Sequence, residues 1–381
     1  MNHSKQVYVD TGSKPPLRKT FILDVLRGVA ALYVLIGHAR WLLWEGYSEG
    51  FKLHSEMYDP FHTILVYGFS VFGFGHQAVM LFFVLSGFVI HYSSIHHYQK
   101  TDSFSVSSYL YKRFKRIYPP FIIALLLTFL LDTIGTTLGY SIYTSTTAFP
   151  IINLSIHSDL SWHTLVGNVC MLQTLYSPVF GSNGPLWSLM YEWWFYMLYI
   201  PIFFINKQHP LFTVLLLGGM FILALFIPVS AFKWITVLHY FFAWYLGVIA
   251  ADWYMGRLDG IKKRILLFVY LFGVFAFATY LMGFSYMVDY YLAAGFVVFM
   301  YLSLKCSASI MNFKTLLPLS DFSYTLYVIH LPILVLMSGW LQNRMGGALP
   351  MHFGYVLVGI VVCLFIAWTV HFLVEKPSKK H

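Results

Sequence analysis

The hydrophobic and polar positions of the chain form long apolar runs separated by short polar stretches. Each run is near the roughly twenty residues that a helix needs to cross a bilayer. The runs cover residues 21–44, 76–97, 117–138, 185–206, 210–229, 234–255, 264–284, 286–304, 320–342 and 352–374. The pattern predicts an all-α, polytopic integral membrane protein with about ten transmembrane helices.

Three other stretches are harder to classify. Residues 61–75 are apolar and rich in glycine, which fits a re-entrant or an interfacial segment, and residues 161–176 are similarly ambiguous. The polar stretch 139–184 contains many Ser and Thr residues and no Lys or Arg. It fits the mouth of a site for a hydroxylated acceptor, and it fits a solvated connector as well.

Composition and charge support this class and indicate an orientation. Hydrophobic residues make up 59% of the chain and charged residues 10%, whereas a soluble domain is about a quarter charged. The net charge of +9 alone would suggest a nucleic-acid partner, but the basic residues lie in short loops, where membrane topology explains them better. With both termini in the cytoplasm, nineteen of the twenty-four basic residues lie on the cytoplasmic side and three on the other.

The expected organisation is one membrane domain with short tails. We expect a cytoplasmic tail over residues 1–20, a transmembrane domain over 21–376 and a cytoplasmic tail over 377–381. The first tail lacks the short apolar core of a cleavable signal peptide, so we expect the first span to be retained. The three cysteines are far apart and show no metal or redox spacing, and we expect no metal site.

The first apolar run carries three ionisable residues, Asp24, Arg27 and His38. Such groups are costly inside a membrane, and they commonly face the interior of a bundle and serve a function. Arg27 and His38 are eleven residues apart, which at about 100° per residue puts them within roughly 20° of each other around a helix. Asp24 lies one turn before Arg27 and can pair with it. The stripe indicates a functional path, although a neutral His38 satisfied by a neighbouring helix also fits.

A second candidate group is the basic stretch that precedes Pro119. Arg113 and Arg116 are three residues apart, so they share a face of a helix. Two guanidinium groups at an inner membrane boundary suit the phosphates of a cytosolic ligand. Topology and anionic lipids also require basic residues there, so a purely topological role stays open.

Two more polar residues lie inside apolar runs. Glu192 is about two turns inside its run, at the depth of His38, so the two side chains can meet. A carboxylate beside an imidazole orients it and raises its basicity. The alternative is that Glu192 bonds a neighbouring Tyr or Trp. His330 lies near the middle of its run, two residues before Pro332, which frees a backbone carbonyl one turn earlier.

The other histidines and the missing motifs narrow the chemistry. His91, His239 and His371 lie near the ends of predicted spans, and we expect them at the membrane interface. Several intramembrane histidines also suggest bis-histidine haem ligation, which requires facing pairs at one depth. The sequence has no P-loop, no Gly-x-Ser-x-Gly elbow, no His-Glu-x-x-His and no Rossmann fingerprint, which disfavours ATP-driven transport and soluble-type hydrolases.

Six short motifs are spread over most of the chain. They are Leu23-Asp-Val-Leu-Arg-Gly-Val-Ala-Ala31 through Gly37-His38, Ala78-Val-Met-Leu-Phe-Phe-Val-Leu-Ser-Gly-Phe-Val-Ile90, Arg113-Phe-Lys-Arg116-Ile-Tyr-Pro119, Trp187-Ser-Leu-Met-Tyr-Glu192 with Phe195-Tyr196, Ser323-Tyr-Thr-Leu-Tyr-Val-Ile-His330-Leu-Pro332, and Glu375-Lys-Pro377. In this order they resemble the membrane acyltransferase-3 family, which includes O-antigen and exopolysaccharide O-acetyltransferases. Ala78-Val79 replaces the family's frequent Gly-Val, a mild departure.

The resemblance implies an acyl-coenzyme A donor that enters from the cytosol as a co-substrate, with no permanently bound cofactor. It implies an acceptor acylated on the outer side of the bacterial cytoplasmic membrane. It also implies that His38 is the essential catalytic residue and that Arg27, Arg113 and Arg116 serve activity or donor binding. Many relatives add a C-terminal extracytoplasmic domain. Since this chain ends at His381, we expect any second acyl-handling step to use a separate extracytoplasmic partner.

We therefore expect a membrane acyltransferase that moves an acyl group, in the first place acetyl, from acyl-coenzyme A to a hydroxyl of an extracytoplasmic or lipid-linked carbohydrate. His38 acts as general base or as a covalent acyl carrier. Glu192 orients His38 or the acceptor, and Asp24 and His330 belong to the substrate site.

Besides donor and acceptor, the expected partners are membrane lipids, and no nucleic acid. The alternative function is a transporter or exporter of polysaccharide or lipid-linked glycan, which has no reason to bind coenzyme A. A structural membrane subunit is disfavoured because it leaves the charged stripe of the first run without a reason.

Overall fold

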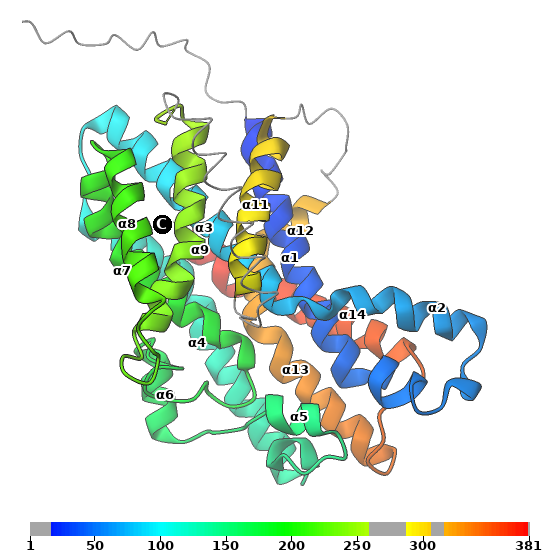
Figure 1. Ribbon diagram of the computed structural model, residues 1–381. Helices are drawn as coiled ribbons and strands as arrows, with labels where there is room; N and C mark the ends of the chain where they lie inside the picture. The colour runs from blue at the N-terminus through cyan, green and yellow to red at the C-terminus, as the bar shows by residue number, and fades with distance from the viewer. Residues whose placement is uncertain (1–16, 259–286, 306–315, 380–381) are drawn as a thin grey trace, which may run out of the picture.

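The computed structural model describes residues 17–258, 287–305 and 316–379, which form helices joined by loops (Figure 1). In the part described, seven helices are long and apolar enough to cross a membrane. They are α1 (Leu17–Leu43), α3 (Gly75–Thr101), α4 (Val106–Thr137), α7 (Trp187–Asn206), α9 (Ile235–Tyr254), α13 (Ser323–Arg344) and α14 (Gly354–Val370). Two shorter apolar helices are α8 (Pro210–Ala224) and α11 (Met287–Lys305). The predicted span 264–284 lies outside the described residues, and every other predicted span overlaps one of these helices.

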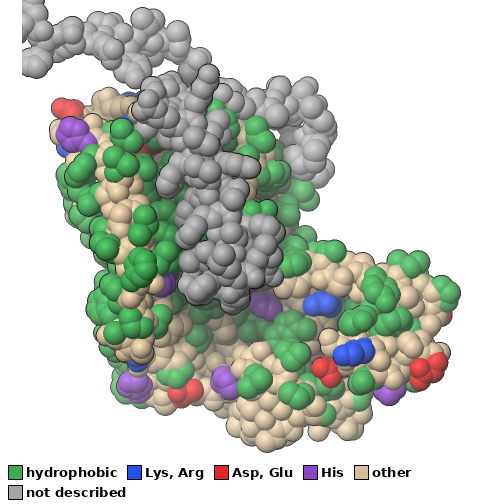
Figure 2. Space-filling model, viewed as in Figure 1, with side chains coloured by type: hydrophobic (Ala, Val, Ile, Leu, Met, Phe, Trp, Pro, Cys, Tyr) green, Lys and Arg blue, Asp and Glu red, His purple; other side chains and the backbone are tan. Residues whose placement is uncertain are grey.

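The outer surfaces of the long helices are apolar. On α14, Leu357, Val361 and Phe365 are 52%, 64% and 66% exposed, and their spacing of four residues puts them on one stripe. Figure 2 shows hydrophobic side chains along the helices and charged side chains gathered mainly toward the two ends. A surface of this kind suits hydrocarbon rather than water. The chain is an all-α, polytopic integral membrane protein, as the sequence predicts.

The bundle has two chemically different ends. The basic end, at the top of Figure 1, is where α1 begins, and the start of α4 with its arginines lies there too. The loop end carries the long segment between α4 and α7, at the bottom of Figure 1, and the connection between α1 and α3, which extends to the right. These two names are used below for the positions of the functional side chains.

Helices α3 and α9 pack closely at a reciprocal pair of glycines. A Cβ atom on Gly87 would lie 2.0 Å from the carbonyl oxygen of Trp244, and one on Gly247 would lie 2.0 Å from that of Val84. Each glycine therefore accommodates the backbone of the opposite helix. Small residues allow this close approach, which favours helix association in a membrane, where the hydrophobic effect does not drive it.

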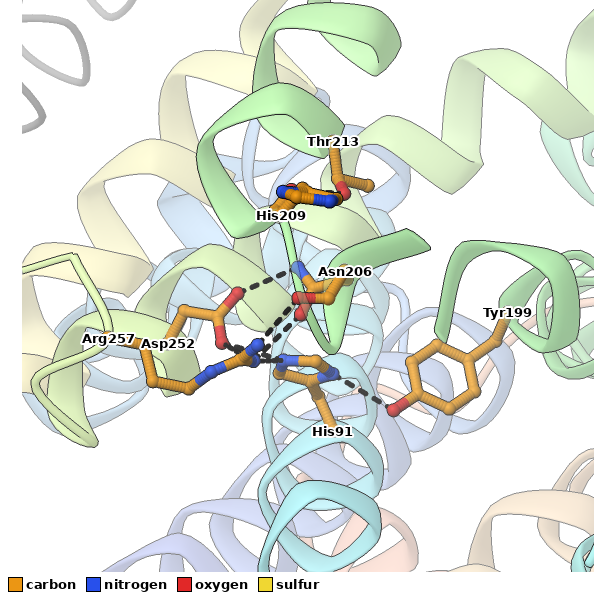
Figure 3. A network of polar contacts seen from close by, with 7 residues as sticks. All are labelled: His91, Tyr199, Asn206, His209, Thr213, Asp252 and Arg257. Atoms are coloured by element: carbon orange, nitrogen blue, oxygen red, sulfur yellow. Dashed lines mark hydrogen bonds and ion pairs between the residues drawn. The ribbon is translucent and has the colours of Figure 1, made fainter. Parts of the chain in front are cut away.

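A buried polar network near the basic end joins α3, α7 and α9 (Figure 3). The two ring nitrogens of His91 lie 2.9 Å from the hydroxyl of Tyr199 and 2.8 Å from the carboxylate of Asp252. Arg257 forms an ion pair with the same carboxylate. His91 is fully buried in the bundle and His371 is buried too, so neither side chain lies on the outer surface. Their place at the depth of the membrane interface stays a prediction.

The glycine-rich stretch after α1 forms a short surface helix rather than a span. Helix α2 (Pro60–Phe69) begins at a proline, and Asp59 caps it by accepting a hydrogen bond of 2.8 Å from the backbone N–H of His62. The helix lies crosswise to α1 in Figure 1, and its ten residues are too few to cross a bilayer. Phe61 and Ile64 are 65% and 70% exposed, which favours the interfacial interpretation.

The long segment 139–184 is folded against the bundle, so the interpretation as a solvated connector is wrong. Its ambiguous apolar part forms α6 (Trp162–Val169), which is too short to span. The buried carboxylate of Asp132 on α4 accepts hydrogen bonds of 2.7 Å from the N–H and the hydroxyl of Ser182, and one of 2.8 Å from the hydroxyl of Ser158. These bonds attach the segment to α4 at two points.

Candidate functional site

A cavity of about 550 Å³ opens at the loop end, and we call it the loop-end cavity. Helices α1, α3 and α13 contribute to its wall, and so do η5 (Gly184–Leu186), the turn that leads into α7, and α5 (Pro150–Ser155) of the long segment. Its polar and aromatic lining comprises His38, Arg40, Trp41, Trp44, Glu45, Tyr47, Glu49, His76, Trp187 and Tyr327. The cavity therefore combines one predicted catalytic histidine with many aromatic surfaces, an arrangement typical of small-molecule sites.

His38 and His330 meet at this cavity from helices α1 and α13. Nδ1 of His38 lies 2.7 Å from Nε2 of His330. The two rings are nearly parallel, at 11°, and their centroids are 5.0 Å apart. Because the nitrogens are much closer than the centroids, the contact is an edge-to-edge hydrogen bond rather than a face-to-face stack. His330 is buried, whereas His38 is partly exposed and lines the cavity.

The backbone around His330 is shaped by Pro332. A proline inside a helix has no N–H for the carbonyl four residues earlier, which here belongs to Val328. The side chain of Asn183, at the end of the long segment, donates a hydrogen bond of 2.8 Å to that carbonyl. Asn183 is fully buried, so a loop side chain satisfies the group that the proline leaves free, as membrane helices require.

A second, smaller cavity of about 70 Å³ lies toward the basic end, and we call it the arginine cavity. Arg27, Arg113 and Arg116 all line it. Arg27 donates to the hydroxyl of Ser323 and pairs with Asp24, each at 3.2 Å. The predicted pair of Asp24 and Arg27 is therefore present, and Asp24 lies here rather than beside His38.

Helix α4 places both of its arginines on the face that borders this cavity, as their spacing predicts. The guanidinium of Arg113 lies over the rings of Tyr109 and Tyr196, with centroid distances of 5.3 and 5.7 Å. Nε of Arg113 is buried and has no hydrogen-bond partner among the described residues. The arginines thus form a pre-arranged cationic site for an anionic group.

Glu192 belongs to the arginine cavity, so the predicted contact with His38 is wrong. Its carboxylate accepts a hydrogen bond of 3.1 Å from the hydroxyl of Ser86 and another from the hydroxyl of Tyr196. The alternative from the sequence, a glutamate bonded to a neighbouring tyrosine, is the observed one. A count of residues along two helices does not decide which neighbour a side chain faces, and here Glu192 and His38 line different cavities.

The two cavities meet at Val79 and Tyr327, which line both of them. The hydroxyl of Tyr327 lies 2.8 Å from Oγ of Ser188 and donates over 3.1 Å to the carbonyl of Pro185. Tyr327 is buried, and its hydroxyl is held by the first residues of α7 and of the turn that leads into it. Val79 and Tyr327 therefore lie between the cavity of the arginines and the cavity of His38.

Sequence reasoning missed His76, the second histidine that lines the loop-end cavity. Nε2 of His76 lies 2.8 Å from the carboxylate of Asp289 on α11, and its ring stacks on that of Trp187 with a centroid distance of 5.1 Å. The sequence offered only one signal, namely that His76 and Asp289 each lie at or near the start of an apolar run. Their pairing across 213 positions of the chain is set by tertiary packing.

Bis-histidine haem ligation has no support in this geometry. The facing pair that it requires would be His38 and His330, but the two rings contact each other directly at 2.7 Å, and both nitrogens of His330 already have hydrogen-bond partners. Among the described residues no group of three or more His, Cys, Asp or Glu side chains is arranged to hold a metal ion.

A protein-family model described as an acyltransferase domain matches residues 21–372 of the chain. The match runs from the start of the first apolar run to the turn after α14, so it includes both cavities and the histidine pair. Comparisons of the chain with curated proteins and with solved structures give no significant match.

Proposed function

The chain belongs to the membrane acyltransferase-3 family, and we propose that it transfers an acyl group, in the first place acetyl, from cytosolic acyl-coenzyme A to a hydroxyl of an extracytoplasmic or lipid-linked carbohydrate. Family membership makes it a membrane acyltransferase. The observation that carries the proposed donor and acceptor is the meeting of two unlike cavities at Val79 and Tyr327.

The arginine cavity suits the donor. Coenzyme A carries phosphates, and guanidinium groups bind phosphate oxygens in pairs. Arg113 and Arg116 lie on the first turns of α4, near the basic end, and Arg27 borders the same cavity from α1. Glu192 and Asp24 offset part of this positive charge and keep the side chains in place, since Asp24 pairs with Arg27. The pantetheine arm, which is long and thin, would point from the arginines toward Tyr327.

The loop-end cavity suits the acceptor. Its aromatic side chains offer flat apolar faces, and Glu49 and Arg40 offer groups that bond hydroxyls. The long segment contributes Phe149 and Ile152, which supports its expected role as part of the acceptor's mouth. We also propose that the protein lies in a bacterial cytoplasmic membrane. In this orientation the loop end faces the outside of the cell and both termini lie in the cytoplasm.

His38 is placed to perform the transfer. As general base it takes the proton of the acceptor hydroxyl while the oxygen attacks the thioester carbonyl, and the proton then passes to the departing thiolate of coenzyme A. In the covalent variant the imidazole attacks the thioester first and the thiolate leaves. The acceptor hydroxyl oxygen then takes the acyl group from His38, and the hydroxyl proton passes to the thiolate of coenzyme A. Both routes need the thioester to reach the junction of the two cavities. A separate extracytoplasmic protein would perform any second acyl-handling step.

The direct test uses the purified protein in lipid vesicles, isotope-labelled acetyl-coenzyme A and a mixture of surface glycans as acceptor. We expect the appearance of free coenzyme A together with glycan that carries the labelled acetyl mass. Glycan that crosses the vesicle membrane without consumption of acetyl-coenzyme A would overturn the proposal in favour of a transporter. Hydrolysis of the donor with no labelled glycan would contradict the carbohydrate acceptor alone.

A further inference from the structure

We propose that His330 is a positioning residue that fixes which nitrogen of His38 carries the proton, and that it thereby keeps the reactive nitrogen of His38 free. The catalytic part of this inference rests on the proposed function, in which His38 is the base or nucleophile. It replaces the sequence-based expectation that His330 contacts the substrate.

The first step concerns His330 itself. Its Nδ1 lies 2.8 Å from the carbonyl oxygen of Tyr327 and 3.1 Å from that of Leu326. Carbonyl oxygens only accept hydrogen bonds, so Nδ1 of His330 must carry a hydrogen. A neutral imidazole has one N–H, which leaves Nε2 of His330 as an acceptor.

The second step carries this constraint to His38. Nδ1 of His38 lies 2.7 Å from that acceptor. If Nδ1 of His38 lacked a hydrogen, two lone pairs would face each other at this distance. His38 therefore donates through Nδ1–H, and its Nε2 keeps a lone pair. Among the described residues the hydrogen bond of the His38 ring is the one through Nδ1 to His330, and the ring lines the loop-end cavity.

The reverse arrangement needs a charged His330 that donates through Nε2–H. His330 is 1% exposed, and its side chain contacts two backbone carbonyls and the His38 ring, with no carboxylate among its described hydrogen-bond partners. A buried charge without such a partner is strongly unfavourable. When His38 takes a proton from the acceptor, in contrast, its Nδ1–H bond to His330 becomes charge-assisted and stronger. His330 thus takes the orienting place that a carboxylate occupies in a Ser-His-Asp triad.

The scaffold holds His330 in register. The two carbonyls that accept its proton belong to the preceding turn of α13, directly before the Val328 carbonyl that Asn183 satisfies. The ring therefore cannot shift without moving a turn of α13 to which the long segment is bonded.

The test compares His330→Gln with His330→Leu in the purified protein in vesicles. A glutamine side chain offers a carbonyl oxygen near the position of Nε2, whereas leucine fills similar space and accepts no hydrogen bond. We expect His330→Leu to lower kcat by about 10²–10⁴, with an unchanged KM for acetyl-coenzyme A, because the wrong tautomer of a base loses most of its effect. We expect His330→Gln to recover most of that loss.

A second measurement does not depend on transfer. Diethyl pyrocarbonate acylates unprotonated imidazole nitrogen, and peptide mass spectrometry reports its rate at His38. We expect the rate at His38 to fall in His330→Leu and to stay near that of the wild type in His330→Gln. Equal loss of kcat and of His38 reactivity in both variants would overturn the positioning role and indicate a packing role. Wild-type values of kcat and of His38 reactivity in His330→Leu would also overturn the positioning role. A wild type that transfers nothing from acyl-coenzyme A would overturn the proposed function, while the reactivity comparison would still decide the tautomer.

Discussion

The hydroxyl of Tyr327 lies 2.8 Å from Oγ of Ser188 at the boundary of the arginine cavity and the loop-end cavity. In the proposed reaction the acyl group must lie beside this pair when it leaves coenzyme A. The size of the ring at position 327 then limits the size of the acyl group. This relationship leads to the first prediction.

Tyr327→Ala should broaden the acyl groups that the protein accepts. Removal of the ring enlarges the junction, so the ratio of kcat/KM for butyryl-coenzyme A to that for acetyl-coenzyme A should rise. We expect a rise of about tenfold, which is the effect that one methylene group commonly has in a hydrophobic pocket. Tyr327→Phe keeps the ring and loses only the hydroxyl, so its ratio should stay near that of the wild type. An unchanged ratio in Tyr327→Ala would show that the acyl group lies elsewhere.

His38→Ala should abolish transfer while the protein still folds and inserts. Loss of a general base typically costs about 10²–10⁴ in rate, and loss of a covalent carrier costs at least as much. Size-exclusion profiles and thermal unfolding in detergent check folding, and release of coenzyme A checks activity. Wild-type turnover in this variant would contradict every role of His38 in the reaction.

Arg113→Ala combined with Arg116→Ala should raise the KM for acyl-coenzyme A more than it changes kcat. The two guanidinium groups border the arginine cavity, where they would hold donor phosphates before and during transfer alike. Lys112→Ala is the matched control, because Lys112 is exposed on the same helix and does not line that cavity. If the control and the double variant had the same KM, the arginines would have a topological role only.

Asp132→Ala should destabilise the protein. Three donors from the long segment would lose their acceptor in a buried place, and each unsatisfied buried group costs about 1–3 kcal/mol. A lower Tm in detergent and faster proteolysis within residues 139–184 would report this. Glu56→Ala removes an exposed carboxylate at the same end and should leave both unchanged. A wild-type Tm for Asp132→Ala would mean that the segment is held by other contacts.

Gly87→Ala should separate α3 from α9. The added Cβ would lie 2.0 Å from the carbonyl oxygen of Trp244, a backbone atom that cannot rotate away. Overpacking typically costs about 1–3 kcal/mol, and a contact with backbone belongs at the upper part of that range. Gly295→Ala is the control, since a Cβ there meets nothing within 4 Å. Equal Tm values for the two variants would show that the two helices can move apart at little cost.

The sequence predicts features that depend on the spacing of residues within a single helix. The lengths of the apolar runs predicted the membrane class and every described long helix. The spacing of Asp24 and Arg27 predicted an ion pair that is present at 3.2 Å. Arg113 and Arg116 share a face of α4, as three-residue spacing requires.

Contacts between helices far apart in the chain were not predictable in this way. His38 and His330 are 292 residues apart, and only packing of α1 on α13 joins them. Glu192 has another neighbour than predicted, because it lines the arginine cavity and not the loop-end cavity of His38. His91 was placed by its position in a run, whereas its burial follows from Asp252 and Tyr199.

The bond from Asn183 to the carbonyl of Val328 has a consequence for protein engineering. The range of acceptors could be altered by grafting the segment 139–184 from a relative. Such a graft would leave the Val328 carbonyl without a hydrogen-bond donor in a low-dielectric interior unless it also supplies a side-chain amide at position 183. The segment and helix α13, which contains Pro332, form one exchangeable module, and chimaeras should be cut so that both come from the same parent.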